Sequence, residues 1–128
     1  LRPYGERFAL VASALCFGLF HGNLNQFFYA FLLGLVLAEL ALSTGCLWQA
    51  VLLHALVNLF SILWGWLGGP VVVTGVLMLA GAMVPFRLIP ALLARPDAER
   101  GTWRRFLTSP GVLCFGALSL SLALSYLI

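Results

Sequence analysis

Residues 26–58, QFFYAFLLGLVLAELALSTGCLWQAVLLHALVN, contain two apolar runs separated by the short turn STG. The first run, Phe27 to Leu42, is interrupted only by Glu39, and the second extends from Leu47 to Leu67. A helix rises about 1.5 Å per residue and a bilayer hydrocarbon core is about 30 Å thick, so crossing it takes roughly 20 apolar residues. These runs therefore predict two membrane helices joined by a tight turn.

The rest of the chain has the same apolar character. Hydrophobic residues make up 62% and charged residues 9% of the 128 residues, and the mean hydropathy is +1.06, which excludes an ordinary water-soluble domain. Three further apolar segments are Phe8 to Phe20, Pro70 to Phe86 and Val112 to Ile128. We therefore expect an all-α, polytopic transmembrane helix bundle of about five hydrophobic segments, forming one membrane domain over residues 1–128.

The positive charges predict how this bundle is oriented. All seven are arginines, in two groups: Arg2 and Arg7, then Arg87, Arg95, Arg100, Arg104 and Arg105. An even number of apolar segments separates the two groups of arginines, which places both groups at the same face of the membrane. Basic residues in short loops usually stay on the cytoplasmic side, so this face is expected to be the cytoplasmic one. This parity holds whether the first two segments cross the membrane or form a re-entrant hairpin, so both arrangements remain open. We expect a multi-pass protein of the cell membrane with cytoplasmic arginine-rich loops.

The most polar stretch is RPDAERGTWRR, residues 95–105. It is expected to be a loop or a surface-lying segment, with Trp103 as an interfacial anchor. The net charge of +3 then reflects topology and contact with membrane lipid rather than with nucleic acid, because no basic and aromatic interleaving is present. The cysteines Cys16, Cys46 and Cys114 show no metal-type pairing and are expected to be free.

Three polar side chains interrupt the apolar segments. His21 ends the first, and His54 and Asn58 lie four residues apart in the third, which places them one turn apart on the same helix face. Burying each of these side chains in a membrane costs desolvation free energy. A common polar site, in which all three find polar partners, would offset that cost for all of them together. Separate packing roles, in which each residue hydrogen-bonds a neighbouring helix, are the alternative.

The depth of the two histidines constrains the arrangement. In straight helices that start at one face, His21 would lie about 20 Å and His54 about 10 Å from that face. A tilted or re-entrant first hairpin, with GNLNQ at residues 22–26 forming a polar tip in a cavity, would bring them level. An ordinary loop at the membrane surface is the other interpretation of GNLNQ. Gly18 and Gly22 form a small-xxx-small pattern that allows close helix approach.

The ordered motifs FGLFH (17–21), STGCLW (43–48) and HALVN (54–58) resemble the CPBP family. This family contains intramembrane proteases of the CAAX prenyl endopeptidase and bacteriocin-processing or bacteriocin-immunity types. Its FxxxH motif is matched by Phe17 and His21, and its HxxxN motif by His54 and Asn58. The resemblance covers a core at residues 8–62 and leaves 63–128 as additional transmembrane helices with a basic loop near 95–105.

The family motif EExxxR does not occur in this sequence. In the family it precedes the segment that ends in FxxxH, and it supplies the general base. Because the sequence starts at Leu1, we expect an N-terminally truncated member whose EExxxR lies upstream. Glu39 is not assigned as a replacement base: it is expected to reach the interface or to pair with an arginine.

The resemblance implies an intramembrane endopeptidase that hydrolyses a membrane-associated peptide or protein. A glutamate would activate water with help from His21, while His54 and Asn58 would stabilise the oxyanion. In a second version, His21 and His54 bind a divalent metal such as zinc, which activates the water. Two other functions remain open: a non-catalytic membrane scaffold or bacteriocin-immunity-type partner, and a bis-histidine haem or metal-binding helix bundle.

Overall fold

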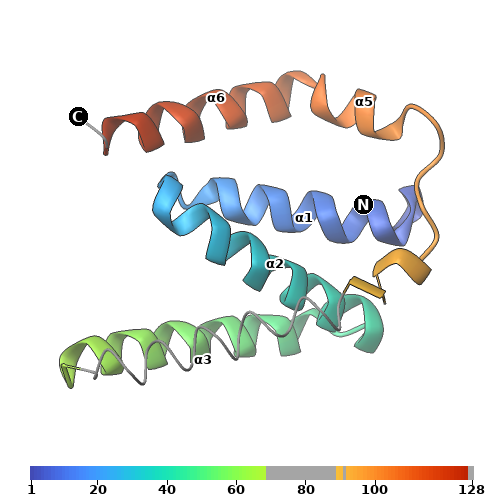
Figure 1. Cartoon of the computed structure of the whole chain (residues 1–128). Coiled ribbons are helices and arrows are strands. Elements are labelled where there is room, and N and C mark those ends of the chain that lie inside the picture. The colour runs from blue at the N-terminus through green and yellow to red at the C-terminus, as the bar shows by residue number, and fades with distance from the viewer. Residues whose placement is uncertain (69–88, 91, 127–128) are drawn as a thin grey trace.

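The computed structural model describes residues 1–68, 89–90 and 92–126, and this part of the chain is all-α, as predicted (Figure 1). The fourth apolar segment, Pro70 to Phe86, lies outside the described residues. The elements in chain order are the short 3₁₀ helix η1 (Arg2–Tyr4) and the helices α1 (Glu6–Phe20), α2 (Leu24–Thr44), α3 (Leu47–Trp66), α5 (Thr102–Leu107) and α6 (Pro110–Ser125).

Two of these helices are long and apolar enough to cross a membrane: Gln26–Thr44 within α2, and α3. They are the two helices predicted from residues 26–58. The other predicted segments are shorter, because α1 has 15 and α6 has 16 residues, or about 22 and 24 Å, less than the roughly 30 Å of a hydrocarbon core. The described part of the chain therefore contains four of the five predicted hydrophobic segments, two of them as long as a membrane span and two of them shorter.

The turn between α2 and α3 forms as the sequence predicts. Gly45 adopts a left-handed conformation, with φ +67°, that a residue with a side chain rarely adopts. The Thr44 hydroxyl donates to the Leu40 carbonyl at 2.7 Å and accepts from the Cys46 amide at 3.2 Å. These bonds satisfy backbone groups at the helix junction, so the chain reverses within two residues.

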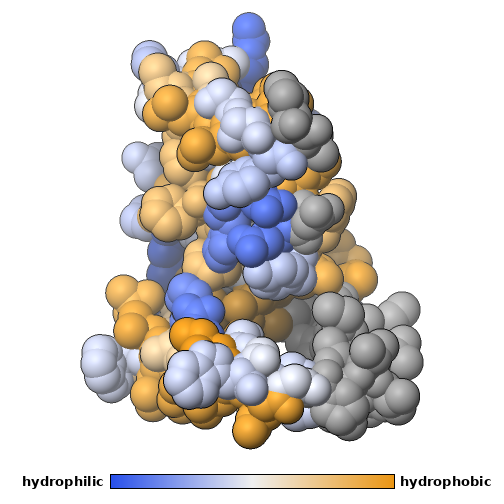
Figure 2. Space-filling view, turned by 90° about the vertical axis from the view of Figure 1, so that its left-hand side faces the viewer, coloured by the Kyte–Doolittle hydropathy of each residue, from blue (hydrophilic) through white to orange (hydrophobic). Residues whose placement is uncertain are grey.

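The turn between α1 and α2 is shorter than predicted. Gly22 has φ +57°, but α2 already begins at Leu24, so the second half of the expected polar tip GNLNQ is helical. The Asn23 carbonyl accepts from the amides of Gln26 and Phe27 at 3.1 and 2.9 Å, which starts the helix there. Figure 2 faces the end of the molecule that carries this turn, where a hydrophilic patch interrupts a largely apolar surface.

Small residues bring α1 and α2 into close contact. A Cβ atom on Gly34 would lie 2.9 Å from the Ala14 Cα, and one on Gly18 would lie 3.2 Å from the Phe27 carbonyl oxygen. Close backbone approach of this kind is a common basis of helix association in membranes. The close approach predicted at Gly18 is confirmed. Gly22 instead faces α6, because a Cβ there would meet Leu122 at 3.2 Å.

Gly34→Ala is expected to destabilise the chain by about 1–3 kcal/mol, because the added methyl group would meet backbone rather than a flexible side chain. Gly65→Ala in α3 is the matched control: no atom of the described residues lies within 4 Å of its Cβ position, so alanine should leave stability unchanged or raise it by up to about 1 kcal/mol. Unfolding of the detergent-solubilised chain by sodium dodecyl sulfate, followed by circular dichroism, measures both. Equal effects of the two substitutions would contradict the prediction.

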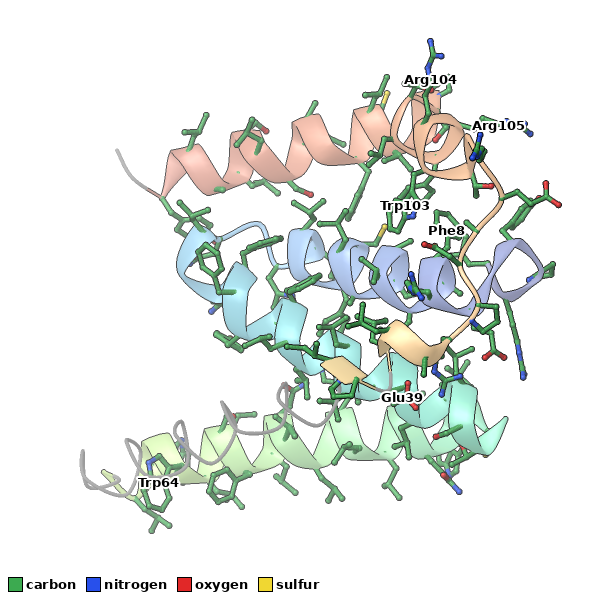
Figure 3. The ribbon with its side chains drawn as sticks, turned by 45° about the vertical axis from the view of Figure 1, so that its right-hand side comes forward. Phe8, Glu39, Trp64, Trp103, Arg104 and Arg105 are labelled. Atoms are coloured by element: carbon green, nitrogen blue, oxygen red, sulfur yellow. The ribbon has the colours of Figure 1, made fainter. Side chains whose placement is uncertain are left out.

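The segment after residue 95 contains a short helix. Residues 102–107 form α5, and Trp103 is half-buried, while its role as an interfacial anchor stays a prediction. Its ring lies edge-on to Phe8 at 4.8 Å, and Phe106 meets Phe8 at 5.4 Å (Figure 3). Because Trp103 and Phe106 are three residues apart, both lie on the α5 face that covers Phe8, which is 2% exposed.

Candidate functional site

The site is organised around one aromatic ring, that of Phe17 near the end of α1. The imidazole of His21 lies edge-on to it with ring centroids 5.0 Å apart, and the imidazole of His54 does so at 5.1 Å. His21 follows the last residue of α1, whereas His54 lies in the first half of α3. The structure therefore brings both histidines to the same ring, although they are expected at different depths in straight full-length helices.

The hydrogen bond of His21 fixes its chemical form. Nδ1 lies 2.8 Å from the Phe17 carbonyl oxygen one turn earlier in the chain. A carbonyl only accepts, so Nδ1 carries a hydrogen and donates it. In the neutral ring Nε2 is then an unprotonated acceptor, which can take a proton from water or bind a cation.

His54 and Asn58 form a pair on α3. The Asn58 amide Nδ2 donates to His54 Nε2 at 3.1 Å, which confirms that the two residues share a helix face. With Nε2 accepting, the neutral His54 ring carries its hydrogen on Nδ1. The pair therefore presents two further N–H donors, at His54 Nδ1 and at the second hydrogen of the Asn58 amide.

An apolar groove of about 460 Å³ runs between α1, α2 and α3 and reaches His54 and Phe17. Its other lining residues are Leu1, Arg2, Ala9, Ser13, Gly34, Leu37, Ala38, Ala41, Leu42, Leu47, Ala50 and Val51. The sequence does not single out Ser13 or Gly34 as site residues. A signal was present nonetheless, because Ala9, Ser13 and Phe17 recur every four residues and so follow one face of α1.

The predicted metal ligands do not by themselves build a metal site. A catalytic zinc ion usually has three protein ligands, and the described residues contain no group of three or more histidine, cysteine, aspartate or glutamate side chains that could hold a metal ion. His54 Nε2 also accepts a hydrogen bond from Asn58, and both imidazoles lie against Phe17. A divalent metal or a bis-histidine haem therefore stays a prediction.

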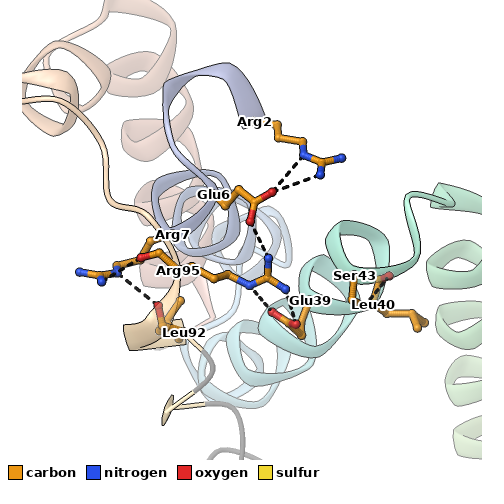
Figure 4. A network of polar contacts seen from close by, with 8 residues as sticks. All are labelled: Arg2, Glu6, Arg7, Glu39, Leu40, Ser43, Leu92 and Arg95. Carbon is orange, nitrogen blue, oxygen red and sulfur yellow. Dashed lines mark hydrogen bonds and ion pairs between the residues drawn. The ribbon is translucent and has the colours of Figure 1, made fainter.

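Two acidic side chains, those of Glu6 and Glu39, contact Arg95 at the end of α1 opposite to Phe17 (Figure 4). Arg95 donates to both carboxylate oxygens of Glu39 and, through Nη1, to Glu6 at 2.7 Å. The prediction that Glu39 pairs with an arginine is confirmed. The hydrogen bond from Arg95 is the main cause that holds the pKa of Glu6 below its ordinary value, with Arg2 contributing further, against a smaller opposing effect of desolvation. Glu6 and Glu39 thus share Arg95 as an ion-pair partner.

A second arginine fixes the neighbouring chain segment. The guanidinium of Arg7 donates to three carbonyls, those of Leu92, Leu93 and Arg95, at 3.2, 2.6 and 3.0 Å, and it also contacts Asp97 at 3.0 Å. Residues 92–97 are therefore attached to the start of α1. The sequence gives little signal for these contacts of Arg7 and Arg95, because the partners lie far apart in the chain. Glu39 and Arg95 are separated by 56 positions, and Arg7 and Asp97 by 90.

The fold and the site together define an all-α protein with two candidate membrane helices, in which His21 and His54 contact the Phe17 ring and an apolar groove reaches Phe17 and His54. Residues 1–60 match the family described as type II CAAX prenyl endopeptidase Rce1-like. The resemblance stated from FxxxH and HxxxN is confirmed, since Phe17, His21, His54 and Asn58 all fall within the match. The comparisons with curated proteins and with solved structures give no match.

Proposed function

We propose that this chain belongs to an intramembrane endopeptidase that hydrolyses a membrane-associated peptide or protein at His21, His54 and Asn58. The observation that carries the proposal is the contact of His21 from α1 and His54 from α3 with one ring, that of Phe17. This contact lies at an apolar groove inside a domain of a protease family. We place this chemistry in a multi-pass protein whose arginine-rich end is cytoplasmic.

The hydrogen-bond pattern suits the steps of peptide hydrolysis. A water must lose a proton as it attacks the carbonyl carbon, and His21 Nε2 offers an acceptor for the water. The oxyanion that forms requires fixed donors, and His54 Nδ1 and Asn58 Nδ2 each offer one. The carboxylate that serves as general base in the family is the EExxxR glutamate, and this motif does not occur in residues 1–128.

The groove also favours a substrate with an apolar chain. Its lining is mainly alanine, leucine and other apolar side chains, and it leads to the paired polar groups. Apolar surface that enters such a groove leaves water or lipid and packs against the helices. The family name points to prenylated substrates, so a peptide ending in a farnesylated CAAX sequence is the appropriate probe.

Asn58→Leu is expected to lower kcat/KM for this probe by about 100-fold, because one oxyanion donor is lost. The assay follows release of a quenched fluorophore by the full-length protein in membranes. Ser61→Leu is the matched control: it makes the same kind of change one turn away on α3, where the Ser61 hydroxyl only bonds the Val57 carbonyl. Unchanged hydrolysis in Asn58→Leu, or an equal loss in Ser61→Leu, would refute the role assigned to Asn58.

One observation favours a second function, that of a non-catalytic membrane scaffold or immunity-type partner. Glu6, Glu39 and Asp97 are each engaged by an arginine, and none contacts the imidazoles. Among the described residues, no carboxylate is therefore placed to act as base. A full-length protein that never cleaves the probe, yet needs His21 and His54 only for stability, would support this second function.

A further inference from the structure

We propose that Arg100, Arg104 and Arg105 form a binding site for the headgroup of an anionic membrane phospholipid. The proposal concerns the outer side of α5 and does not depend on the proposed peptidase activity. Arg104 and Arg105 project away from the bundle, whereas Trp103 of the same helix points toward Phe8 (Figure 3).

The first step is the distribution of charge at this end of the molecule. Arg2, Arg7 and Arg95 are each paired with a carboxylate. In the described part of the chain, by contrast, no ion pair is formed by Arg100, Arg104 or Arg105, and all three are exposed. Glu99 is the remaining acid in this segment. Among the described residues, this segment therefore carries three unpaired positive charges and one negative charge, and the resulting positive surface attracts anions.

The second step is what lies beside the positive surface. The apolar helix α6 follows α5 directly, and the leucines along it are half or more exposed: Leu113, Leu118, Leu120, Leu122 and Leu124. Ser119 is its one buried residue in the described range. Cations at one end of an exposed apolar helix match an amphipathic molecule with an anionic head and hydrocarbon chains. A phospholipid has this form, whereas a soluble anion would use only the arginines.

The third step is the rigidity of the platform. Trp103 packs on Phe8 at 4.8 Å and Phe106 packs on it at 5.4 Å, so α5 is fixed to the first turn of α1. Arg104 and Arg105 lie between these two aromatic residues in the chain and are therefore held on the opposite, outward side. Little backbone entropy therefore remains to be lost when a headgroup binds.

The test measures lipid binding by native mass spectrometry of the detergent-solubilised protein. Phosphatidylglycerol and phosphatidylcholine with identical acyl chains are titrated in parallel. We expect tighter binding of phosphatidylglycerol, and a loss of about 25-fold in that binding for Arg104→Gln/Arg105→Gln, at about fivefold per arginine. Arg104→Lys/Arg105→Lys keeps both charges and should retain most of the preference. Arg2→Gln removes a paired arginine of the same end and should leave the preference intact.

Three results would overturn the proposal. Equal binding of the two lipids by the unaltered protein would remove the anionic preference. Full preference in the double glutamine variant, with native helix content by circular dichroism, would place the lipid elsewhere. Displacement of phosphatidylglycerol by inorganic phosphate at matched ionic strength would show a site for free anions instead of a lipid site.

Discussion

Replacing His21 by alanine is expected to lower kcat/KM for the farnesylated CAAX peptide by about 10²- to 10⁴-fold, the range that a positioned proton-transfer group contributes. The physical reason is the free Nε2, which is available because Nδ1 is bonded to the Phe17 carbonyl at 2.8 Å. Alanine removes this acceptor and leaves His54 as the imidazole that packs on Phe17. The loss should appear mainly in kcat, since the apolar groove is unaltered.

Phe20→Ala is the matched control for His21→Ala. Phe20 is the neighbouring residue at the end of α1 and is 76% exposed, so its removal shortens a side chain beside the site without touching Phe17 or His54. Both variants should keep native helix content by circular dichroism. Equal turnover by His21→Ala and the unaltered protein would exclude His21 from the chemistry, and a fall in both variants would indicate damage to the α1–α2 turn instead.

Arg95→Met is expected to reduce the free energy of unfolding by about 1–3 kcal/mol. Removing one partner of a fully buried ion pair usually costs roughly 3–5 kcal/mol, whereas an exposed pair contributes about 0–1 kcal/mol. The side chains here retain 18 to 25% exposure, so the expected loss lies between these limits. Glu6 and Glu39 would lose their shared cation and be left facing each other. Arg95→Lys should recover only part of this stability, because a single ammonium group cannot reproduce the forked contact with Glu39.

Arg2→Met separates this effect from the general loss of a positive charge. The Arg2 side chain is 61% exposed and pairs with Glu6 one helical turn away, an arrangement worth less than about 1 kcal/mol. Chemical unfolding of the detergent-solubilised protein at neutral pH measures both variants. Similar small losses for Arg2→Met and Arg95→Met would show that the Arg95 cluster adds nothing beyond surface charge.

The same cluster predicts a pH dependence of known sign. The pKa of Glu6 is held below 4.5, chiefly by the hydrogen bond from Arg95, so its contribution to stability is complete above pH 4.5. It is lost as the pH falls through the folded-state pKa, where the carboxylate takes up a proton. The difference in stability between the unaltered protein and Arg95→Met should therefore be constant from pH 7 to about 4.5 and shrink below that.

Features that depend on neighbours along one helix could be predicted from the sequence. The α2 and α3 helices and their turn follow from two apolar runs around Gly45. The one-turn spacing of His54 and Asn58 likewise predicts their shared face. Each of these inferences needs only the helical repeat and the conformational freedom of glycine, which are local properties.

Contacts between distant segments could not be predicted in this way. Trp103 among arginines has the pattern of an interfacial anchor, yet it packs on Phe8, because α5 turns its aromatic side toward α1. Glu6 and Arg95 lie 89 positions apart, and no periodicity connects them. Phe17 belongs to the FxxxH motif of the sequence. Its contact with both imidazoles, however, follows only from how α1, α2 and α3 are arranged.

The bonds of Arg7 bear on how this protein can be divided for study. Its guanidinium donates hydrogen bonds to three backbone carbonyls between residues 92 and 95. Arg7 therefore holds in place a segment that lies well beyond residue 60, where the family match stops. Excision of residues 1–60 would strip Arg7 of these acceptors and Glu39 of Arg95, and would uncover Phe8 where Trp103 now shields it. The evolutionary unit and the folding unit therefore have different boundaries. Segment-swapping chimaeras that exchange the family core should carry residues 92–107 with it.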